Sequence, residues 1–156
     1  MDIKSLRKKL GLTQVEAAKT VNISLRSYKS YENDISKVNT IKYDYILSRL
    51  TEYGRIDEEK GILSLKDIRD TVNDILQNYE VEYCYLFGSY SKGNARENSD
   101  VDLLLASSVS GLDFYGLVEK LRTRLHKKVD LLTVDQLKDN FQLINDILKE
   151  GIKIYG

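Results

Sequence analysis

Two aspartates interrupt an apolar run in the segment DVDLLLA, residues 100–106. A carboxylate in a buried strand is costly unless something pairs with it. Because residues i and i+2 of a strand face the same side, Asp100 and Asp102 project together while Val101 and Leu103 face the other way. Two adjacent carboxylates repel each other, and a divalent cation would remove the conflict. The segment therefore predicts a strand that holds a charged ligand at one face of a sheet.

A third acid interrupts another short apolar run. Asp130 lies in KKVDLLT, residues 127–133. On an adjacent strand about 4.8 Å away it would join the other two carboxylates. Magnesium prefers carboxylate oxygens together with phosphate oxygens. Asp100, Asp102 and Asp130 are therefore the candidate catalytic and metal-binding residues.

The sequence Gly88-Ser89 ends the apolar run YCYLF, residues 83–87. Glycine permits a tight turn or a close approach of the backbone to a ligand. Ser89 offers a hydroxyl and a backbone N–H, and the residues up to Gly93 predict a short helical turn whose free N–H groups would face a phosphate. Lys92 adds a positive charge. Gly88, Ser89 and Lys92 are the candidate nucleotide-binding residues.

The length of 156 residues fits one domain or two small ones. Residues 1–53 carry ten Lys or Arg and six Asp or Glu, whereas residues 54–156 carry fourteen and eighteen. The polar segment GRIDEEKGIL, residues 54–63, predicts a linker. We therefore expect two domains: an all-α helical bundle over residues 1–53 and an α/β domain with a mixed sheet over residues 64–156.

The front half has helical signals throughout. TQVE at residues 13–16 is a capping-box sequence, and Ser24 is a second N-cap. Asn22 can adopt the left-handed backbone of the turn between them. The predicted helices cover residues 3–10, 13–19, 24–32 and 40–53. In the last of these, Ile41, Tyr45 and Ile46 are expected to face inward.

The back half alternates helices with strands, which is typical of an α/β domain. A helix is predicted from the Ser64 cap to about residue 79. Strands are predicted at residues 83–87, 100–106 and 128–132. A helix at residues 113–126 separates the last two strands, and residues 134–150 are predicted to be helical.

Some classes of protein are disfavoured by what the sequence lacks. Cys84 is the single cysteine and lies in an apolar run, so it is expected to be a core side chain. His126 is the single histidine and has no companions for a zinc site. No apolar run approaches the length of a membrane span, and the N-terminus does not resemble a signal peptide. We expect a cytoplasmic protein with no membrane partner.

Gly88-Ser89, ten further residues and then Asp100-x-Asp102 resemble the signature of the DNA polymerase β-like nucleotidyltransferase superfamily. The closing KEGIKIYG resembles the EG(I/V)xxY tail of its minimal nucleotidyltransferase (MNT) proteins. The resemblance implies transfer of a nucleoside monophosphate from a nucleoside triphosphate to a hydroxyl group. It implies that Asp100 and Asp102 hold two Mg²⁺ ions, that Asp130 binds one of them and helps deprotonate the acceptor, and that Ser89 and Lys92 contact the triphosphate.

Residues 12–33, LTQVEAAKTVNISLRSYKSYEN, resemble the helix-turn-helix of the Cro/C1 (XRE) repressor family. The resemblance implies a recognition helix at residues 24–31 in the major groove of DNA. Gln14 would anchor to a phosphate, and Arg26 would read guanine. Asn33, where the family usually has glycine, and the apolar Leu25 depart from the pattern. The implied DNA-binding residues are Gln14, Ser24, Arg26, Ser27, Lys29 and Ser30, with Leu25 also facing outward.

Together the two resemblances imply an antitoxin of a toxin–antitoxin system. Such a protein would transfer AMP from ATP to a HEPN-type toxin and would repress its own operon at operator DNA, as a homodimer or as a hetero-oligomer with the toxin. Two alternatives stay open. One is a non-catalytic repressor that binds the toxin, and the other is a small-molecule nucleotidyltransferase of the aminoglycoside-modifying type.

Overall fold

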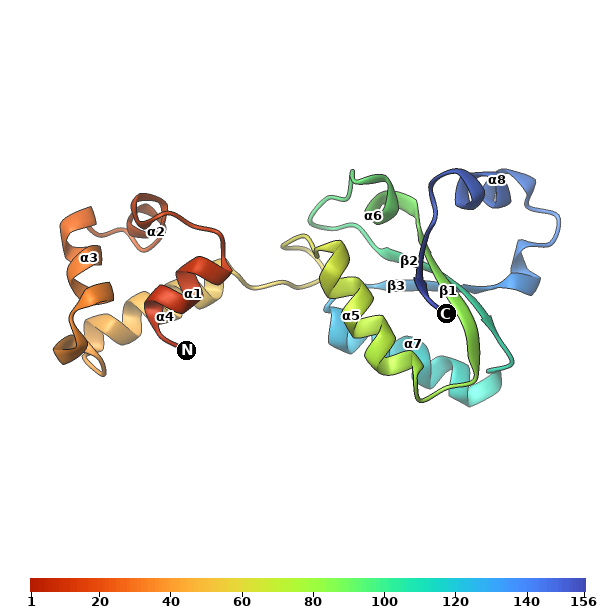
Figure 1. Cartoon of the computed structure of the whole chain (residues 1–156), viewed down its shortest axis with the longest axis horizontal. Coiled ribbons are helices and arrows are strands. Elements are labelled where there is room, and N and C mark those ends of the chain that lie inside the picture. Colours follow the sequence, from red (N-terminus) through yellow and green to blue (C-terminus); the bar gives the residue numbers. More distant parts are fainter. The chain divides into compact units, whose positions relative to one another are not determined.

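The computed structural model describes residues 1–156 and consists of two compact units, Met1–Arg55 and Ile56–Gly156 (Figure 1). The first unit is all helical, and the second combines helices with a four-stranded mixed sheet. The predicted fold class is confirmed. No helix is long and apolar enough to cross a bilayer.

The local signals of the first unit work as predicted. Glu16 N–H donates to Thr13 Oγ1 (3.2 Å) and Thr13 N–H donates to Glu16 Oε2 (2.7 Å), which completes the capping box. Ser24 caps the next helix, and Asn22 has a φ of 58° in the turn between. The helices are α1 (Ile3–Lys9), α2 (Gln14–Thr20), α3 (Leu25–Asn33), the 3₁₀ turn η1 (Ile35–Lys37) and α4 (Ile41–Tyr53).

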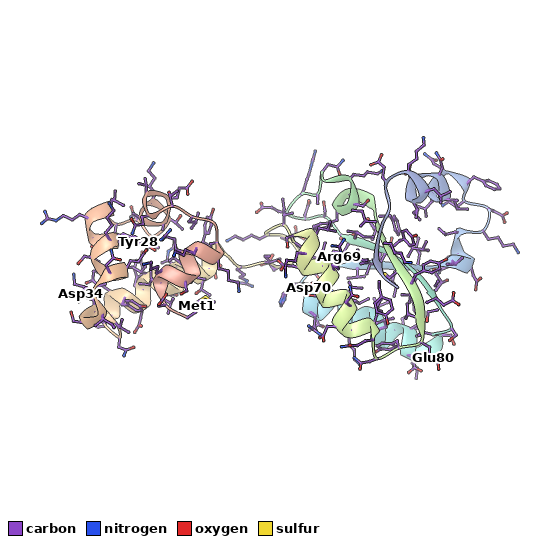
Figure 2. The ribbon with its side chains drawn as sticks, viewed as in Figure 1. Met1, Tyr28, Asp34, Arg69, Asp70 and Glu80 are labelled. Atoms are coloured by element: carbon purple, nitrogen blue, oxygen red, sulfur yellow. The ribbon has the colours of Figure 1, made fainter.

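The core of the first unit surrounds Tyr28, which is fully buried among the helices (Figure 2). The inward face of α4 consists of Tyr43, Ile46 and Leu50. The expectation that Ile41 and Tyr45 face inward is wrong, because these side chains are 91% and 48% exposed. The spacing of 43, 46 and 50 follows one helical face, and Ile41 and Tyr45 lie off it.

The second unit contains α5 (Leu65–Leu76) and α7 (Gly111–Leu125), whose inward side chains pack on one face of the sheet (Figure 1). Cys84, Leu86, Leu103 and Leu105 point into that face, so the predicted core position of Cys84 is confirmed. The strands are β1 (Val81–Phe87), β2 (Val101–Ser107), β3 (Val129–Thr133) and β4 (Ile152–Tyr155). Their order is β3-β2-β1-β4, with β2 and β3 parallel and the other pairs antiparallel.

The opposite face of the sheet is covered in part by the 3₁₀ turn η2 (Val134–Leu137) and by α8 (Phe141–Glu150). Phe87 and Leu104 pack there against Leu137 and Ile147. Asp102 shares the strand parity of Leu104, so its carboxylate belongs to this second, incompletely covered face.

Two features of the C-terminal segment differ from the prediction. Residues 134–150 are not one helix, because Asp139 has a φ of 69° and Asn140 starts α8 afresh by accepting a hydrogen bond from Leu143 N–H (3.1 Å). The edge strand β4 was not predicted. Its four residues pair with β1, and their only local signal is the alternation of Ile152 and Ile154.

The segment expected to be a linker, residues 54–63, lies mostly within the second unit. Leu63 is buried in the core of that unit, and Ile56 packs against the same core. The polar composition of the segment suggested a solvated connection. Two of its three apolar side chains, Ile56 and Leu63, nevertheless pack in the core of the second unit, whereas Ile62 is exposed.

Candidate nucleotidyl-transfer site and DNA-facing helix

Three strands meet where the candidate acids lie. Asp102 on β2 pairs in register with Asp130 on β3, and on its other side with Phe87 at the end of β1. Asp100 precedes β2 by one residue, so it shares the side of Asp102. The structure therefore brings Asp100, Asp102 and Asp130 to one end of the sheet, directly beside Gly88.

Gly88 is the residue that lets Asp102 occupy this position. Its φ is 72°, a backbone conformation that favours glycine. A Cβ atom placed on Gly88 would overlap the Oδ2 atom of Asp102. The tight turn after β1 and the aspartate on β2 thus depend on each other, which gives the Gly-Ser sequence a steric reason.

The surroundings of Asp102 shift its pKa. Burial is the main cause, and together with the negative charges of Asp130 and Asp100 it raises the pKa of Asp102 to about 6. Asp102 is half-buried, whereas Asp100 and Asp130 are exposed. The site is therefore open to solvent, and its central carboxylate, Asp102, is the one whose charged form is disfavoured.

The candidate acids have the right ligand type for a divalent cation, but their side chains are not arranged around a metal position in this structure. No three His, Cys, Asp or Glu side chains stand close enough together to form a metal-binding group in this side-chain arrangement. The donors are carboxylate oxygens, which suit magnesium. A cation would also offset the two causes that raise the Asp102 pKa, which are burial and the charges of the neighbouring carboxylates.

The predicted helical turn after Gly88 is α6 (Gly88–Lys92), which ends at Gly93 with a φ of 75°. No side chain caps its N-terminus. Ser89 lies half-buried at that end. The Lys92 ammonium lies 3.7 Å from Asp146 Oδ2 on α8, so in this structure its nearest charge is that carboxylate.

A cavity of about 660 Å³ lies at the other end of the sheet from the acids. It is lined by the start of β1, beginning at Glu80, and by the ends of β2 and β3. Figure 2 labels Glu80. The register places Val81 opposite Ser107 there, whereas Phe87 lies opposite Asp102. This cavity is therefore separate from the candidate catalytic residues.

The exposed side of α3 in the first unit carries the candidate DNA contacts. Ser24, Arg26 and Lys29 are exposed. Leu25 differs from the expectation, because it packs against the core of the unit. Gln14 points its amide to Glu32 Oε1 (3.3 Å), which ties the start of α2 to α3.

Two lysines that sequence reasoning missed lie beside this helix. Lys42 Nζ donates to Ser27 Oγ (3.2 Å), and Lys37 Nζ donates to Ser30 Oγ. Both ammonium groups also lie over the Tyr31 ring. The distance from Nζ to the ring centroid is 4.8 Å for Lys37 and 5.3 Å for Lys42. The excess of Lys and Arg in residues 1–53 indicated a basic surface, but it did not predict which lysines lie against α3.

Two family models match the sequence. The family described as polymerase beta, nucleotidyltransferase matches residues 70–156, and a helix-turn-helix family matches residues 3–42. The two matches fall on the two structural units, and each contains all the candidate residues of its unit.

Known relatives match the second unit. Protein adenylyltransferase MntA of Thermococcus cleftensis is 30% identical over 100 residues, which is 60% of this chain and 99% of that protein. Protein adenylyltransferase MntA of Shewanella oneidensis is 33% identical over 79 residues, 49% of this chain and 55% of that protein. The chain thus spans about half the length of the Shewanella relative.

Among solved structures, a toxin–antitoxin crystal structure with AMP-PNP shares 25% identity at a TM-score of 0.47. The match covers 56% of this chain and 73% of that one.

Proposed function

Because the chain belongs to the polymerase β-type nucleotidyltransferase family, we propose that it transfers AMP from ATP to a hydroxyl group of a HEPN-type toxin. The names of the relatives, protein adenylyltransferases, support AMP as the group and protein as the acceptor. The toxin partner follows from the resemblance of Gly88-Ser89, Asp100-x-Asp102 and the KEGIKIYG tail to MNT antitoxins.

The observation that carries the proposal is the open site around Asp102. Asp100, two residues earlier on the chain, and Asp130, in register with Asp102 on β3, are both exposed. They lie at the end of a sheet face that α8 and η2 cover only in part. An enclosed pocket would suit a small acceptor. An open carboxylate cluster suits an acceptor that brings its own surface, such as a folded protein.

In the proposed reaction the acceptor oxygen forms a bond to the α-phosphorus of ATP. The bond between that phosphorus and its bridging oxygen breaks, and pyrophosphate leaves. Asp100, Asp102 and Asp130 would hold Mg²⁺, which supplies positive charge to the attacking and leaving oxygens. The exposed Asp130 carboxylate would take the proton of the acceptor hydroxyl, while Ser89 at the start of α6 would bind the triphosphate.

The test is incubation of the full-length protein with α-labelled ATP, MgCl₂ and the purified product of the neighbouring gene. Label on the neighbouring protein, with equimolar pyrophosphate released, is the expected result. A parallel reaction holds an aminoglycoside in place of the neighbouring protein, and label on that compound alone would favour the small-molecule alternative. Tight binding and inhibition of the toxin without label on either protein would favour the non-catalytic repressor.

We further propose that the first unit binds operator DNA and represses the operon, as a dimer or within the toxin complex. The support is the helix-turn-helix match and the exposed Arg26 and Lys29 on α3. Lys37 and Lys42, beside the same helix, would contact phosphates. A mobility-shift titration of upstream DNA against scrambled DNA, with and without the toxin, tests the proposal. Equal affinity for both DNAs would favour a protein-docking role for residues 1–55.

A further inference from the structure

Lys127 is the one charged side chain in the core of the second unit. Its exposed fraction is 0%, and its ammonium donates to the backbone carbonyls of Lys60 (3.2 Å) and Glu97. Burying a charge costs free energy unless hydrogen bonds compensate, so a buried ammonium on two carbonyls calls for an explanation. The proposed reaction assigns it no role.

We infer that Lys127 is a positioning residue of the transfer site, which fixes the loop that carries Asp100. The inference rests on the proposed function. The loop runs from Gly93, where α6 ends, to Asp100, just before β2. Glu97 lies near its middle, so the bond from Lys127 to the Glu97 carbonyl holds the loop at a point three residues before the carboxylate.

Asp100 needs such support because its own side chain is exposed and has no packing to fix it. Its place is set by the backbone on both sides. On the far side, Val101 N–H donates to the Lys128 carbonyl (2.9 Å), immediately after Lys127. The Lys127 side chain therefore fixes the chain before Asp100, and the Lys128 carbonyl fixes the chain after it.

The same ammonium connects this loop to residues 60–63, and two further bonds reinforce the connection. Gly61 N–H donates to Glu97 Oε1 (3.2 Å), and Leu63 N–H lies 3.5 Å from the hydroxyl of Tyr90. Tyr90 is the residue after Ser89 in α6. Residues 60–63 thus brace both the loop that leads to Asp100 and the turn that carries Ser89.

Lysine suits this task because its ammonium is a compact donor on a long stem that can reach two carbonyls from different segments. Removing the ammonium would leave the Glu97 carbonyl without this donor, whereas the Lys60 carbonyl would keep the bond from Asp57 N–H (2.9 Å). That loss would loosen the loop rather than remove a ligand. We therefore expect the variant to weaken metal-dependent transfer while the sheet stays folded.

The experiment compares Lys127→Met with Lys128→Met in the full-length protein. Lys128 is the matched control, because it is the neighbouring lysine and its side chain is exposed. Amide hydrogen exchange is followed by mass spectrometry in peptides covering residues 88–101 and, as reference, residues 117–125. AMP transfer is measured against MgCl₂ concentration, and Mg²⁺ binding in the presence of a non-hydrolysable ATP analogue is measured by calorimetry.

For Lys127→Met we expect faster exchange confined to residues 94–101, a higher MgCl₂ concentration at half-maximal rate, and ~10- to 100-fold slower transfer. Lys128→Met should change none of these. If Lys127→Met fails to fold, Glu97→Ala is the second variant, because the exposed Glu97 carboxylate accepts a hydrogen bond from Gly61 N–H. It should raise loop exchange and the MgCl₂ concentration at half-maximal rate by a smaller amount.

Two results would overturn the inference. One is unchanged or uniformly increased exchange across the second unit, which would make Lys127 an ordinary core residue. The other is faster exchange of the loop with an unchanged MgCl₂ requirement and unchanged Mg²⁺ binding. If wild-type protein transfers no AMP, the exchange and calorimetry still decide whether Lys127 positions a metal site, so failure of the proposed function remains distinguishable.

Discussion

Gly88 and Asp102 lie in contact, the former in the turn after β1 and the latter on β2, so that a Cβ on Gly88 would overlap Asp102 Oδ2. This contact joins the turn that begins α6 to the central carboxylate of the proposed site. A side chain at position 88 would have to displace that carboxylate or the turn itself. The two halves of the Gly-Ser and Asp-x-Asp pattern are therefore sterically coupled.

Gly88→Ala is expected to reduce AMP transfer at least ~100-fold, because the displaced carboxylate is the central one of the three proposed metal ligands. Gly93→Ala is the matched control. Its φ of 75° is similar to the 72° of Gly88, but no atom lies within 4 Å of a Cβ built there. Each alanine carries a backbone strain of roughly 1–2 kcal/mol. Equal loss of transfer in the two variants, measured at matched folded fraction, would refute the steric coupling.

Asp102→Asn is expected to abolish AMP transfer and to leave the fold intact, because the substitution keeps the shape and removes the charge of the central acid. Transfer of labelled AMP is the measurement, at matched MgCl₂ concentration. Asp135→Asn, at an exposed position near the other end of the sheet, is the control and should retain activity. Wild-type rates in Asp102→Asn would rule out the metal-binding role.

The same substitution has a pH-dependent effect on stability without metal. The Asp102 pKa is about 6 in the folded chain, above the unfolded value of about 3.9. The folded state therefore binds the proton more tightly, and wild-type stability falls as pH rises from about 4 to 6 and stays low above it. In EDTA, thermal denaturation should show Asp102→Asn more stable than wild type at pH 7.5, and this advantage should shrink toward pH 4. A constant difference across that range would contradict the assignment.

Arg7 and Glu32 form a bidentate ion pair within the first unit, with both nitrogen–oxygen distances at 2.9 Å and the Glu32 side chain 1% exposed. Glu32→Gln would leave the Arg7 charge without its partner. Breaking such a pair from one side typically costs about 3–5 kcal/mol. Chemical denaturation at pH 7, followed on the helical signal of the first unit, should show the loss, whereas Glu52→Gln at an exposed position should cost far less.

This pair also makes the first unit sensitive to acid. Burial by itself raises the pKa of Glu32, but hydrogen bonds from Arg7 and Gln14 and the charge of Arg7 outweigh it and hold the pKa below its ordinary value. Its stabilising contribution is therefore present above about pH 4.3 and is lost as pH falls through the folded pKa. The stability difference between wild type and Glu32→Gln should shrink below pH 4. A difference that grows there would contradict this direction.

Arg26→Ala should weaken operator binding by about 1–3 kcal/mol and relax the preference at one base position. Lys29→Ala and Lys42→Ala should weaken binding to all sequences alike and lower the slope of affinity against salt concentration. Mobility shifts at several salt concentrations separate the two effects. Half-sites one helical turn apart are expected for a symmetric dimer. An Arg26→Ala protein with wild-type affinity and base preference would exclude Arg26 as a base reader.

The sequence alone determined the features that arise from neighbouring residues. The capping box of Thr13 and Glu16, the Ser24 cap and the left-handed Asn22 depend on contacts within four residues, and each is present in the structure. The alternation of Asp100 and Asp102 likewise follows from the period of a strand. The family resemblance then supplied the chemistry expected of these residues.

Only the tertiary structure decided what depends on residues distant in sequence. It placed Asp130 in register with Asp102, paired β4 with β1, and turned Ile41 and Tyr45 toward solvent. It also gave the adjacent residues Lys127 and Lys128 different environments, because Lys127 is buried in the fold and Lys128 is exposed. Burial of Lys127 requires carbonyls from Lys60 and Glu97, 67 and 30 residues away. No local pattern encodes such a meeting, because the free energy that favours it exists only once those segments have packed together.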